Sequence, residues 1–120
     1  MNKVLLIEDD KTMQSLIKTL LEMEGFSISL PSVMQLDGIL KEIKISPPDA
    51  IIMDVNLRQL SGLDILREIR NCPEINHMKI IMSSGLDLKT DCLKAGADSF
   101  LQKPYMPDDL ITWLKKNINS

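Results

Sequence analysis

Short, nearly all-apolar runs alternate along the chain with segments of helical period, and this alternation constrains the fold more than any other feature. Continuous apolar runs are typical of strands that are buried on both faces of a parallel sheet. Runs of this kind predict strands at residues 4–7, 50–53 and 80–82. Residues 27–30 alternate between polar and apolar side chains, which predicts an edge strand, and residues 99–102 form a weaker, short strand candidate.

The segments between the predicted strands have the spacing of amphipathic helices. Apolar side chains recur every three or four positions in two stripes, one at Met13, Leu16, Ile17, Leu20 and Leu21 and one at Leu36, Ile39, Leu40 and Ile43. Ser61, followed three residues later by Asp64, resembles a capping box that opens a third helix. Residues 87–93 suggest a short fourth helix, and Pro107 suits the first turn of a fifth. Five successive β–α units predict a three-layer α/β fold with right-handed crossovers.

Length and composition bound the class of protein. The chain has 120 residues, 44% of them hydrophobic, which suits one soluble domain over residues 1–120. Its apolar runs are far shorter than the roughly 20 residues that cross a bilayer, so no membrane association is expected. A formal charge of −3 without a basic block argues against nucleic-acid binding by this chain. Cys72 and Cys92 form neither a metal motif nor a disulfide framework, so we expect a cytoplasmic protein with reduced thiols.

Polar residues follow the predicted strands at the edge where parallel strands place their carboxyl ends. They are Glu8, Asp9 and Asp10 after the first strand, Asp54 after the third, Ser83, Ser84 and Gly85 after the fourth, and Lys103 and Pro104 after the fifth. Ligands of open parallel sheets bind outside these ends. Clustered carboxylates repel one another unless a cation neutralises them, and Mg²⁺, a hard cation that prefers oxygen ligands, is the simplest candidate.

A pocket of this composition suits phosphoryl transfer. Protein-bound Mg²⁺ is usually held by one or two carboxylates plus a phosphate, so a lysine and a hydroxyl would receive the remaining phosphoryl oxygens. Asp54 is then the candidate nucleophile and would form an aspartyl phosphate. Lys103 would neutralise the charge on the phosphoryl oxygens.

Five motifs, in this order and at this spacing, resemble the receiver domain of two-component response regulators. They are VLLIEDD at residues 4–10, IIMDVN at 51–56, SGLD at 61–64, SG at 84–85 and GADSFLQKP at 96–104. The resemblance covers essentially all of residues 1–120. It implies a doubly wound (βα)₅, flavodoxin-like three-layer sandwich whose parallel five-stranded sheet has the strand order 2-1-3-4-5.

The resemblance also implies roles for the acids. Asp54 takes the place of the phosphoacceptor, and Asp9 that of a direct ligand of Mg²⁺ or Mn²⁺. Glu8 resembles a second acid that acts directly or through water, and Asn56 would lend its backbone carbonyl to the metal. Asp10 is expected at the rim or as a helix cap rather than as a ligand.

Three further positions resemble those with which the family responds to phosphorylation. Ser84 matches the hydroxyl that moves onto the phosphoryl group, Lys103 the cation that pairs with it, and Phe100 an aromatic switch. By the same resemblance, the bond between Lys103 and Pro104 is expected to be cis.

The sequence departs from the family pattern in two places. Arg58 stands where the family often has Pro in the loop after the phosphoacceptor, which makes the loop more flexible and puts a cation near the pocket rim. Met78 and Lys79 replace the Pro that is common before the fourth strand. These departures bear on phosphoryl lifetime and partner choice, and Asn56 and Leu86 are also expected to influence that lifetime.

The resemblance implies the function of a signalling switch rather than an enzyme. A sensor histidine kinase or a histidine phosphotransfer protein would donate a phosphoryl group to Asp54, and the domain would assist its own phosphorylation and dephosphorylation. The face formed by the fourth helix, fifth strand and fifth helix would then signal to a downstream protein or an output domain. We expect a monomer or a phosphorylation-dependent dimer.

Two other classes of protein remain as alternatives. A haloacid-dehalogenase-type phosphatase also forms an aspartyl phosphate, but it needs a second Asp two residues after the nucleophile, where this sequence has Asn56. A flavodoxin-like cofactor carrier needs hydroxyls and glycine after the first strand, whereas Glu8, Asp9 and Asp10 would repel a phosphate.

Overall fold

Five β–α units build one parallel sheet with helices on both faces. The structure is a computed structural model that describes residues 2–118. The elements are, in chain order, β1 Lys3–Ile7, α1 Lys11–Met23, β2 Ser27–Ser29, α2 Leu36–Ile45, β3 Ala50–Asp54, α3 Gly62–Arg70, β4 Lys79–Ser84, α4 Lys89–Lys94, β5 Ser99–Gln102 and α5 Pro107–Asn117. Each predicted strand and helix is therefore present. In residues 2–118, no helix is long and apolar enough to cross a membrane.

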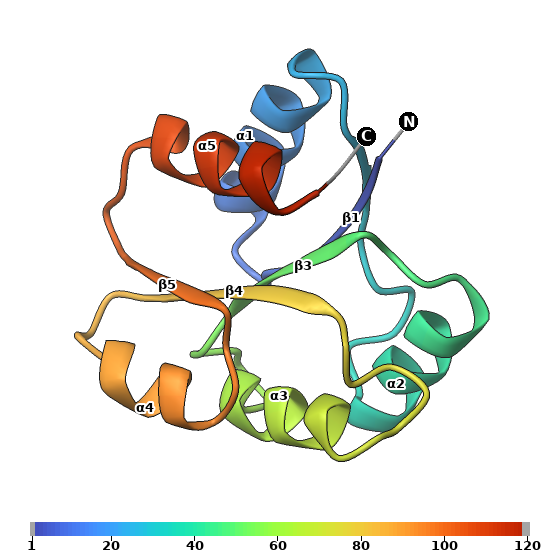
Figure 1. The fold of residues 1–120 in the computed structure, drawn as a ribbon. Helices are drawn as coiled ribbons and strands as arrows, with labels where there is room; N and C mark the ends of the chain where they lie inside the picture. Colours follow the sequence, from blue (N-terminus) through green and yellow to red (C-terminus); the bar gives the residue numbers. More distant parts are fainter. Residues whose placement is uncertain (1, 119–120) are drawn as a thin grey trace.

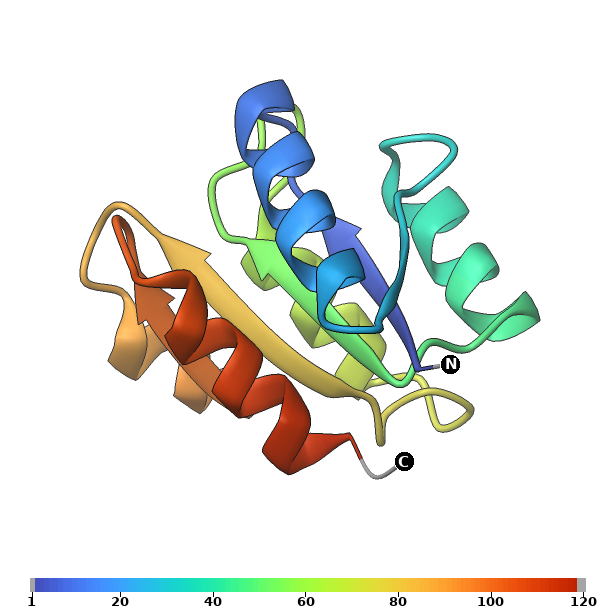
Figure 2. The ribbon, with the colours of Figure 1, turned by 90° about the horizontal axis from the view of Figure 1, so that it is seen from above.

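The sheet has the strand order β2-β1-β3-β4-β5, and every neighbouring pair is parallel. The order 2-1-3-4-5 implied by the sequence is thus confirmed. Helices α1 and α5 cover one face of the sheet, and α2, α3 and α4 cover the other (Figures 1 and 2). All strands run the same way, so their carboxyl ends share one edge, which lies at the back of the view in Figure 1.

The apolar core has two layers, because successive side chains of a strand point to opposite faces of the sheet. Alternate residues of the three central strands face the α2–α3–α4 layer, and these are Leu5, Ile7, Ile51, Met53, Ile80 and Met82. The residues between them face α1 and α5, and these are Val4, Leu6, Ala50, Ile52 and Ile81. The continuous apolar runs in the sequence therefore arise from burial on both faces.

Several helix ends follow from local chemistry. The carboxylate of Asp10 accepts a hydrogen bond from the Met13 N–H at 3.1 Å and caps α1, as expected for the third acid of the run. Gly25, just beyond the end of α1, has a φ of +94°, a left-handed conformation that favours glycine. Ser61 caps α3 through the Asp64 N–H at a long 3.4 Å, and Pro107 opens α5.

Some boundaries and orientations differ from those expected. Strand β4 extends to Ser84, and β3 includes Asp54, because the backbone ladder continues through the pair Asp54–Ser83. Leu16, predicted on the inward stripe of α1, is 48% exposed. Its neighbour Ile17 is buried, so the contact of α1 with the sheet is narrower than the apolar stripe.

Arg70, at the end of α3, joins its helix to two later segments of the chain. Its guanidinium donates to the carbonyl oxygens of Gly96 at 2.8 Å, Asn76 at 2.9 Å and Met78 at 2.7 Å. It also pairs with the carboxylate of Asp98 at 3.0 Å. These bonds fasten α3 to the start of β4 and to the turn before β5, on the side of the molecule away from the strand carboxyl ends.

Candidate functional site: an acidic cleft at the strand ends

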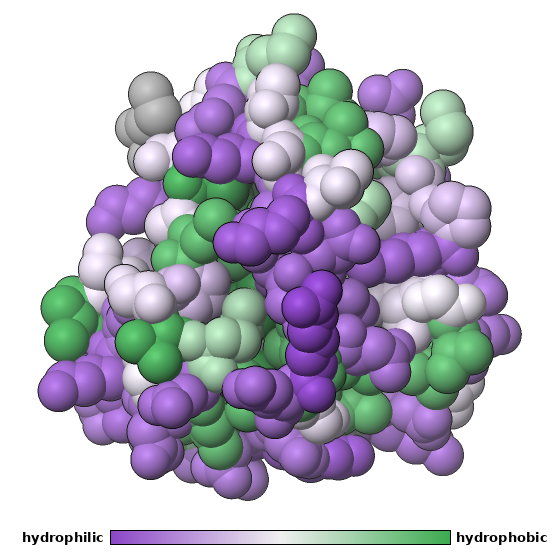
Figure 3. All heavy atoms as spheres, turned by 180° about the vertical axis from the view of Figure 1, so that it is seen from behind, coloured by the Kyte–Doolittle hydropathy of each residue, from purple (hydrophilic) through white to green (hydrophobic). Residues whose placement is uncertain are grey.

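The candidate residues gather where β1, β3, β4 and β5 end. Glu8, Asp9 and Asp10 follow β1 directly, Asp54 and Ser84 are the last residues of β3 and β4, and Lys103 follows β5. Figure 3 views this edge of the sheet from behind, and hydrophilic residues gather across the middle of that face. The convergence predicted from the sequence is therefore present in the structure.

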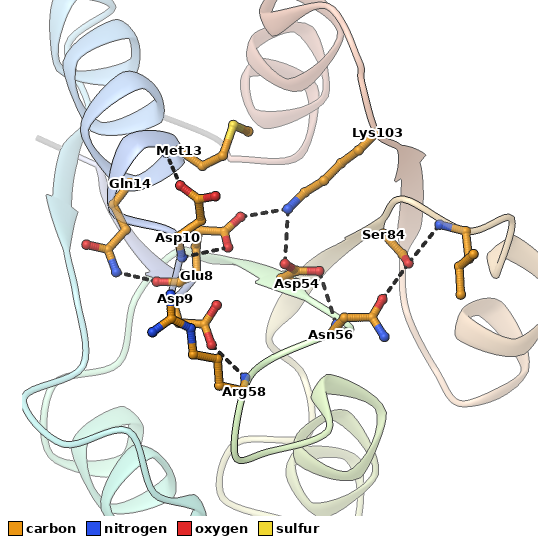
Figure 4. A network of polar contacts seen from close by, with 11 residues as sticks. Glu8, Asp9, Asp10, Met13, Gln14, Asp54, Asn56, Arg58, Ser84 and Lys103 are labelled. Atoms are coloured by element: carbon orange, nitrogen blue, oxygen red, sulfur yellow. Dashed lines mark hydrogen bonds and ion pairs between the residues drawn. The ribbon is translucent and has the colours of Figure 1, made fainter.

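Lys103 lies between two buried acids. Its ammonium Nζ donates to Glu8 Oε1 at 2.8 Å and to Asp54 Oδ2 at 3.0 Å, and Figure 4 shows the side chain pointing between them. Glu8 and Asp54 are only 3% and 7% exposed. The backbone N–H of Lys103 donates to the Ser84 carbonyl at 2.7 Å, and the bond to Pro104 is cis, as the resemblance implied.

The titration behaviour of this trio follows from its burial and charge. Burial raises the pKa of Glu8, more than the hydrogen bonds from Lys103 and the Asp10 N–H lower it, and the charge of Asp54 adds to the rise. For Lys103, burial acts to lower the pKa, but its hydrogen bonds to Glu8 and Asp54 outweigh this and hold the pKa above its usual range. Lys103 is therefore cationic whenever the site works near neutral pH.

The three consecutive acids have three different sets of partners. Glu8 pairs with Lys103, Asp10 caps α1, and Asp9 accepts a hydrogen bond from the backbone N–H of Arg58 at 2.6 Å. Asp9 is half-buried and Asp10 is exposed. The structure thus places Glu8 and Asp9 toward the cleft and Asp10 at its rim, as the sequence indicated.

Asn56 links the nucleophile candidate to the hydroxyl candidate. Its backbone N–H donates to Asp54 Oδ1 at 3.1 Å, and its side-chain Oδ1 accepts from the Ser84 hydroxyl at 2.7 Å (Figure 4). The Ser84 Oγ in turn accepts from the Leu86 N–H at 3.1 Å. The Ser84 side chain is therefore hydrogen-bonded to Asn56, and Asp54 has one oxygen on Lys103 and one on the Asn56 N–H.

A glycine allows the start of α3 to approach the phosphoacceptor candidate. A Cβ added at Gly62 would lie 2.2 Å from the Asp54 carbonyl oxygen and 2.9 Å from the Val55 Cα. The Gly62 N–H donates to the Val55 carbonyl at 2.9 Å. Only glycine allows this close packing, so Gly62 has a structural reason to stand eight positions after Asp54.

Phe100 is buried, at 8% exposure, in the core layer beneath α2, α3 and α4. It lies opposite Met82 in the register between β4 and β5, two residues before Ser84 on the neighbouring strand. Phe100 is therefore two register positions away from the Ser84–Gln102 pair at the end of β4.

Two residues near the cleft were not singled out from the sequence. The side-chain amide of Gln14 donates to the Glu8 carbonyl, and this helps to fix the turn between β1 and α1. Tyr105 is half-buried beside the cleft; burial raises the pKa of its hydroxyl, the charge of Lys103 lowers it, and the charges of Glu8 and Asp54 raise it further. No pattern in the sequence marks either residue, because the position of each depends on how α1 and the segment before α5 pack against the sheet.

The carboxylate oxygens of the cleft are suitable ligands for a hard divalent cation, although in this structure they are paired with Lys103 and the Arg58 N–H. In residues 2–118, no three His, Cys, Asp or Glu side chains are grouped as around a metal ion. Glu8 and Asp54 are held instead by Lys103. The cleft still offers only oxygen donors from the neighbouring strands β1 and β3, and one ammonium offsets only one of the three charges of Glu8, Asp9 and Asp54.

The fold and this cleft define a class of protein. The model of the response regulator receiver domain matches residues 4–115, and the chain belongs to that family, the receiver domains of two-component response regulators. This is a family of signalling domains rather than a classical enzyme family. The alternatives of a haloacid-dehalogenase-type phosphatase and a flavodoxin-like carrier receive no support from the comparisons.

Individual relatives agree with this assignment. The cell cycle transcriptional regulator CtrA of Caulobacter vibrioides is 36% identical over 111 residues, which are 91% of this chain and 47% of CtrA. The chemotaxis protein CheY of Bacillus subtilis is 26% identical over 121 residues, 98% of each chain. The chain spans about half the length of the curated transcriptional regulators that it matches.

A solved structure of a receiver domain has the same fold and aligns over almost the whole length of both chains. It is the receiver domain of the sensor histidine kinase PA1611 from Pseudomonas aeruginosa, with a magnesium ion coordinated in its active site cleft. It has a TM-score of 0.85 and 30% identity to this chain, and the alignment covers 99% of this chain and 98% of that one.

Proposed function

We propose that Asp54 is the phosphoacceptor of this receiver domain. The observation that carries the proposal is the bridge from Lys103 to Glu8 and Asp54, because it fixes a buried carboxylate beside a cation that can receive phosphoryl oxygens. An oxygen of Asp54 would attack phosphorus, forming an O–P bond while the P–N bond of a phosphohistidine breaks. The electron pair of the broken bond stays on the imidazole nitrogen, and water later hydrolyses the acyl phosphate.

The residues of the cleft have separate parts in this reaction. Lys103 would turn from Glu8 toward the phosphoryl oxygens while keeping its charge. Glu8, Asp9, Asp54 and the backbone carbonyl of Asn56 would hold a Mg²⁺ or Mn²⁺ ion. When bound, the ion neutralises the charge shared by the carboxylates and the incoming phosphoryl group. The domain would in this way assist its own phosphorylation and dephosphorylation.

Phosphorylation would be read out through Ser84 and Phe100. The Ser84 hydroxyl would leave Asn56 for a phosphoryl oxygen, and Phe100 would follow into the space behind it. Both residues lie on strands next to α4, so the face formed by α4, β5 and α5 would change shape. This is a population shift driven by a local change of charge.

The proposed setting is a two-component pathway in the cytoplasm. The donor would be a sensor histidine kinase or a histidine phosphotransfer protein, and the receiver of the signal a downstream protein or an output domain. Residues 1–120 would act as one receiver domain, a monomer or a phosphorylation-dependent dimer, that binds neither nucleic acid nor membrane itself.

The test uses a small phosphodonor and Mg²⁺ with the purified chain. Intact-mass measurement should show one added phosphoryl group on the unmodified chain and none on Asp54→Asn, and chelation of the metal should slow the reaction. Asp10→Asn is the matched control, because Asp10 is exposed and Asn preserves a helix cap. Stable phosphorylation of Asp54→Asn would overturn the assignment.

A further inference from the structure

The loop between β3 and α3 makes one direct contact with the acidic run after β1. The backbone N–H of Arg58 donates to Asp9 Oδ2 at 2.6 Å, across 49 residues of sequence. The second oxygen of Asp9 points away from this N–H, toward the side of the cleft where Glu8 and Asp54 lie (Figure 4). The contact therefore fixes the orientation of the Asp9 carboxylate, with one oxygen on the N–H and the other facing the cleft.

The position of this N–H is fixed by the loop rather than by the Arg58 side chain. An antiparallel bridge between Asn56 and Ser61 closes the loop at its base, and the Gly62 N–H donates to the Val55 carbonyl at 2.9 Å. Leu57, next to Arg58, is buried at 9% exposure in the core layer beneath α3. The donor N–H is thus held by contacts of the loop itself and not by a ligand in the cleft.

A hydrogen bond of this kind has a defined effect on a carboxylate. Rotation of an Asp carboxylate about its last bond is otherwise broad, and a charge-assisted N–H···O bond is roughly twice as strong as a neutral one. Hydrogen bonds to metal-binding carboxylates orient them, and their loss typically weakens metal binding by about 10–100-fold. A carboxylate with one oxygen on an N–H still offers its other oxygen to a cation.

We propose that the backbone N–H of Arg58 is a positioning group for the divalent cation site: it holds Asp9 Oδ2 so that the other oxygen, Oδ1, faces the cleft. This rests on the proposed function, in which Asp9 is a metal ligand. The guanidinium has no part in it, since Arg58 is exposed and the contact is made by the main chain. Any residue except proline, which has no N–H, would supply it.

A pair of substitutions separates the N–H from the side chain. Arg58→Pro removes both, and Arg58→Ala removes only the guanidinium. Binding of Mn²⁺, followed by electron paramagnetic resonance of the free ion, should weaken about 10-fold in Arg58→Pro. Arg58→Ala should bind Mn²⁺ no more weakly than the unmodified chain. Urea unfolding in chelator checks that the variants are folded.

Each outcome has a defined meaning. Equal affinity of Arg58→Pro and the unmodified chain would overturn the positioning role alone, and so would an equal loss in Arg58→Ala. Absence of Mn²⁺ binding by the unmodified chain would overturn the metal site and the positioning role together.

A second measurement does not depend on the folding of Arg58→Pro. Arg58 lies in an exposed loop, where a free amide would exchange its hydrogen quickly. Its N–H is hydrogen-bonded to Asp9, so amide hydrogen exchange at Arg58 should be slow in the unmodified chain with Mg²⁺ present. Asp9→Ala should make this exchange fast. Fast exchange at Arg58 in the unmodified, Mg²⁺-loaded chain would also overturn the positioning role.

Discussion

The hydroxyl of Ser84 donates to Asn56 Oδ1 at 2.7 Å, and this hydrogen bond holds the hydroxyl on the Asn56 side chain (Figure 4). The backbone N–H of the same Asn56 donates to Asp54. One residue therefore orients the proposed phosphoacceptor and restrains the hydroxyl that would respond to phosphorylation.

Removing the side-chain oxygen of Asn56, which accepts the hydrogen bond, should release the Ser84 hydroxyl. A neutral hydrogen bond contributes about 1 kcal/mol. Asn56→Ala should therefore raise, up to about fivefold, the population of the conformer in which the Ser84 hydroxyl has turned from position 56 toward Asp54. The backbone N–H resonance of Leu86, which donates to the Ser84 Oγ, should move toward its position in the phosphorylated chain. Asn56→Asp keeps an acceptor oxygen and is the control. An Asn56→Ala spectrum unchanged at Leu86 would contradict this role.

The raised pKa of Glu8 predicts how its replacement acts with pH. Burial raises this pKa above its unfolded value, so the associated stability is present below the unfolded pKa and is lost as the pH rises through the folded pKa. The free energy of unfolding of Glu8→Gln, minus that of the unmodified chain, should therefore increase with pH and then level off. Urea unfolding in chelator, at a series of pH values from about 4 to 8, measures it. A difference that shrinks as the pH rises would contradict the prediction.

Arg70 and Arg67 lie on the same helix and should differ sharply in their contribution to stability. Arg70→Ala removes four donors and leaves partly buried carbonyls without partners, so it should lower the free energy of unfolding by about 3 kcal/mol. Arg67 makes one exposed pair with Asp64 at 3.3 Å, so Arg67→Ala should cost less than about 0.5 kcal/mol. Denaturant unfolding of both variants measures the difference, and equal losses would be inconsistent with the Arg70 contacts.

Gly62 and Gly85 form a second matched pair beside the cleft. A methyl at Gly62 would meet the Asp54 carbonyl at 2.2 Å, whereas nothing lies within 4 Å of one at Gly85. Gly62→Ala should therefore lower the free energy of unfolding by about 3 kcal/mol and slow phosphorylation by displacing Asp54. Gly85→Ala should stay within about 0.5 kcal/mol of the unmodified chain. Full phosphorylation rate and stability in Gly62→Ala would show that the close approach is dispensable.

The two cysteines should differ in their reaction with thiol reagents. Cys92 is fully buried, burial raises the pKa of its thiol, and the charge of Asp91 adds to the rise. Since the thiolate is the reactive form, Cys92 should react more slowly than the half-buried Cys72. Alkylation of Cys72→Ser and Cys92→Ser, followed by mass spectrometry at several pH values, compares the two sites. Faster modification of Cys92 in the folded chain would contradict its burial.

The sequence predicts the sheet well because burial on both faces leaves a continuous apolar run, which Ile51 and Ile52 illustrate. It predicts the acids of the cleft because they directly follow those runs. The ends of strands are harder to predict where their residues are polar. Ser83 belongs to β4 because its backbone pairs with that of Asp54, and its polar side chain does not indicate a strand. Helix faces are also ambiguous, since Leu16 fits the apolar stripe and is nevertheless exposed.

Contacts between a side chain and a backbone group escape sequence analysis altogether. Arg70 binds three carbonyl oxygens from two other segments, and any residues there would offer the same atoms. The hydrogen bond from Arg58 to Asp9 is of the same kind, because its donor is a main-chain N–H. The sequence indicated a flexible loop and a rim cation at Arg58. The structure has an exposed Arg58 side chain and adds a main-chain contact with Asp9 that the sequence did not indicate.

The ion pair of Lys103 with Glu8 joins residues 95 positions apart, and this distance has a consequence for the newly made chain. Until Lys103 has been synthesised, this ammonium is missing from beside the carboxylates of Glu8 and Asp54, which repel each other when both are ionised. The residue that follows the last strand thus supplies the ammonium for an acid that follows the first strand. A chain that ended before Lys103 would leave the buried carboxylates of Glu8 and Asp54 without this ammonium.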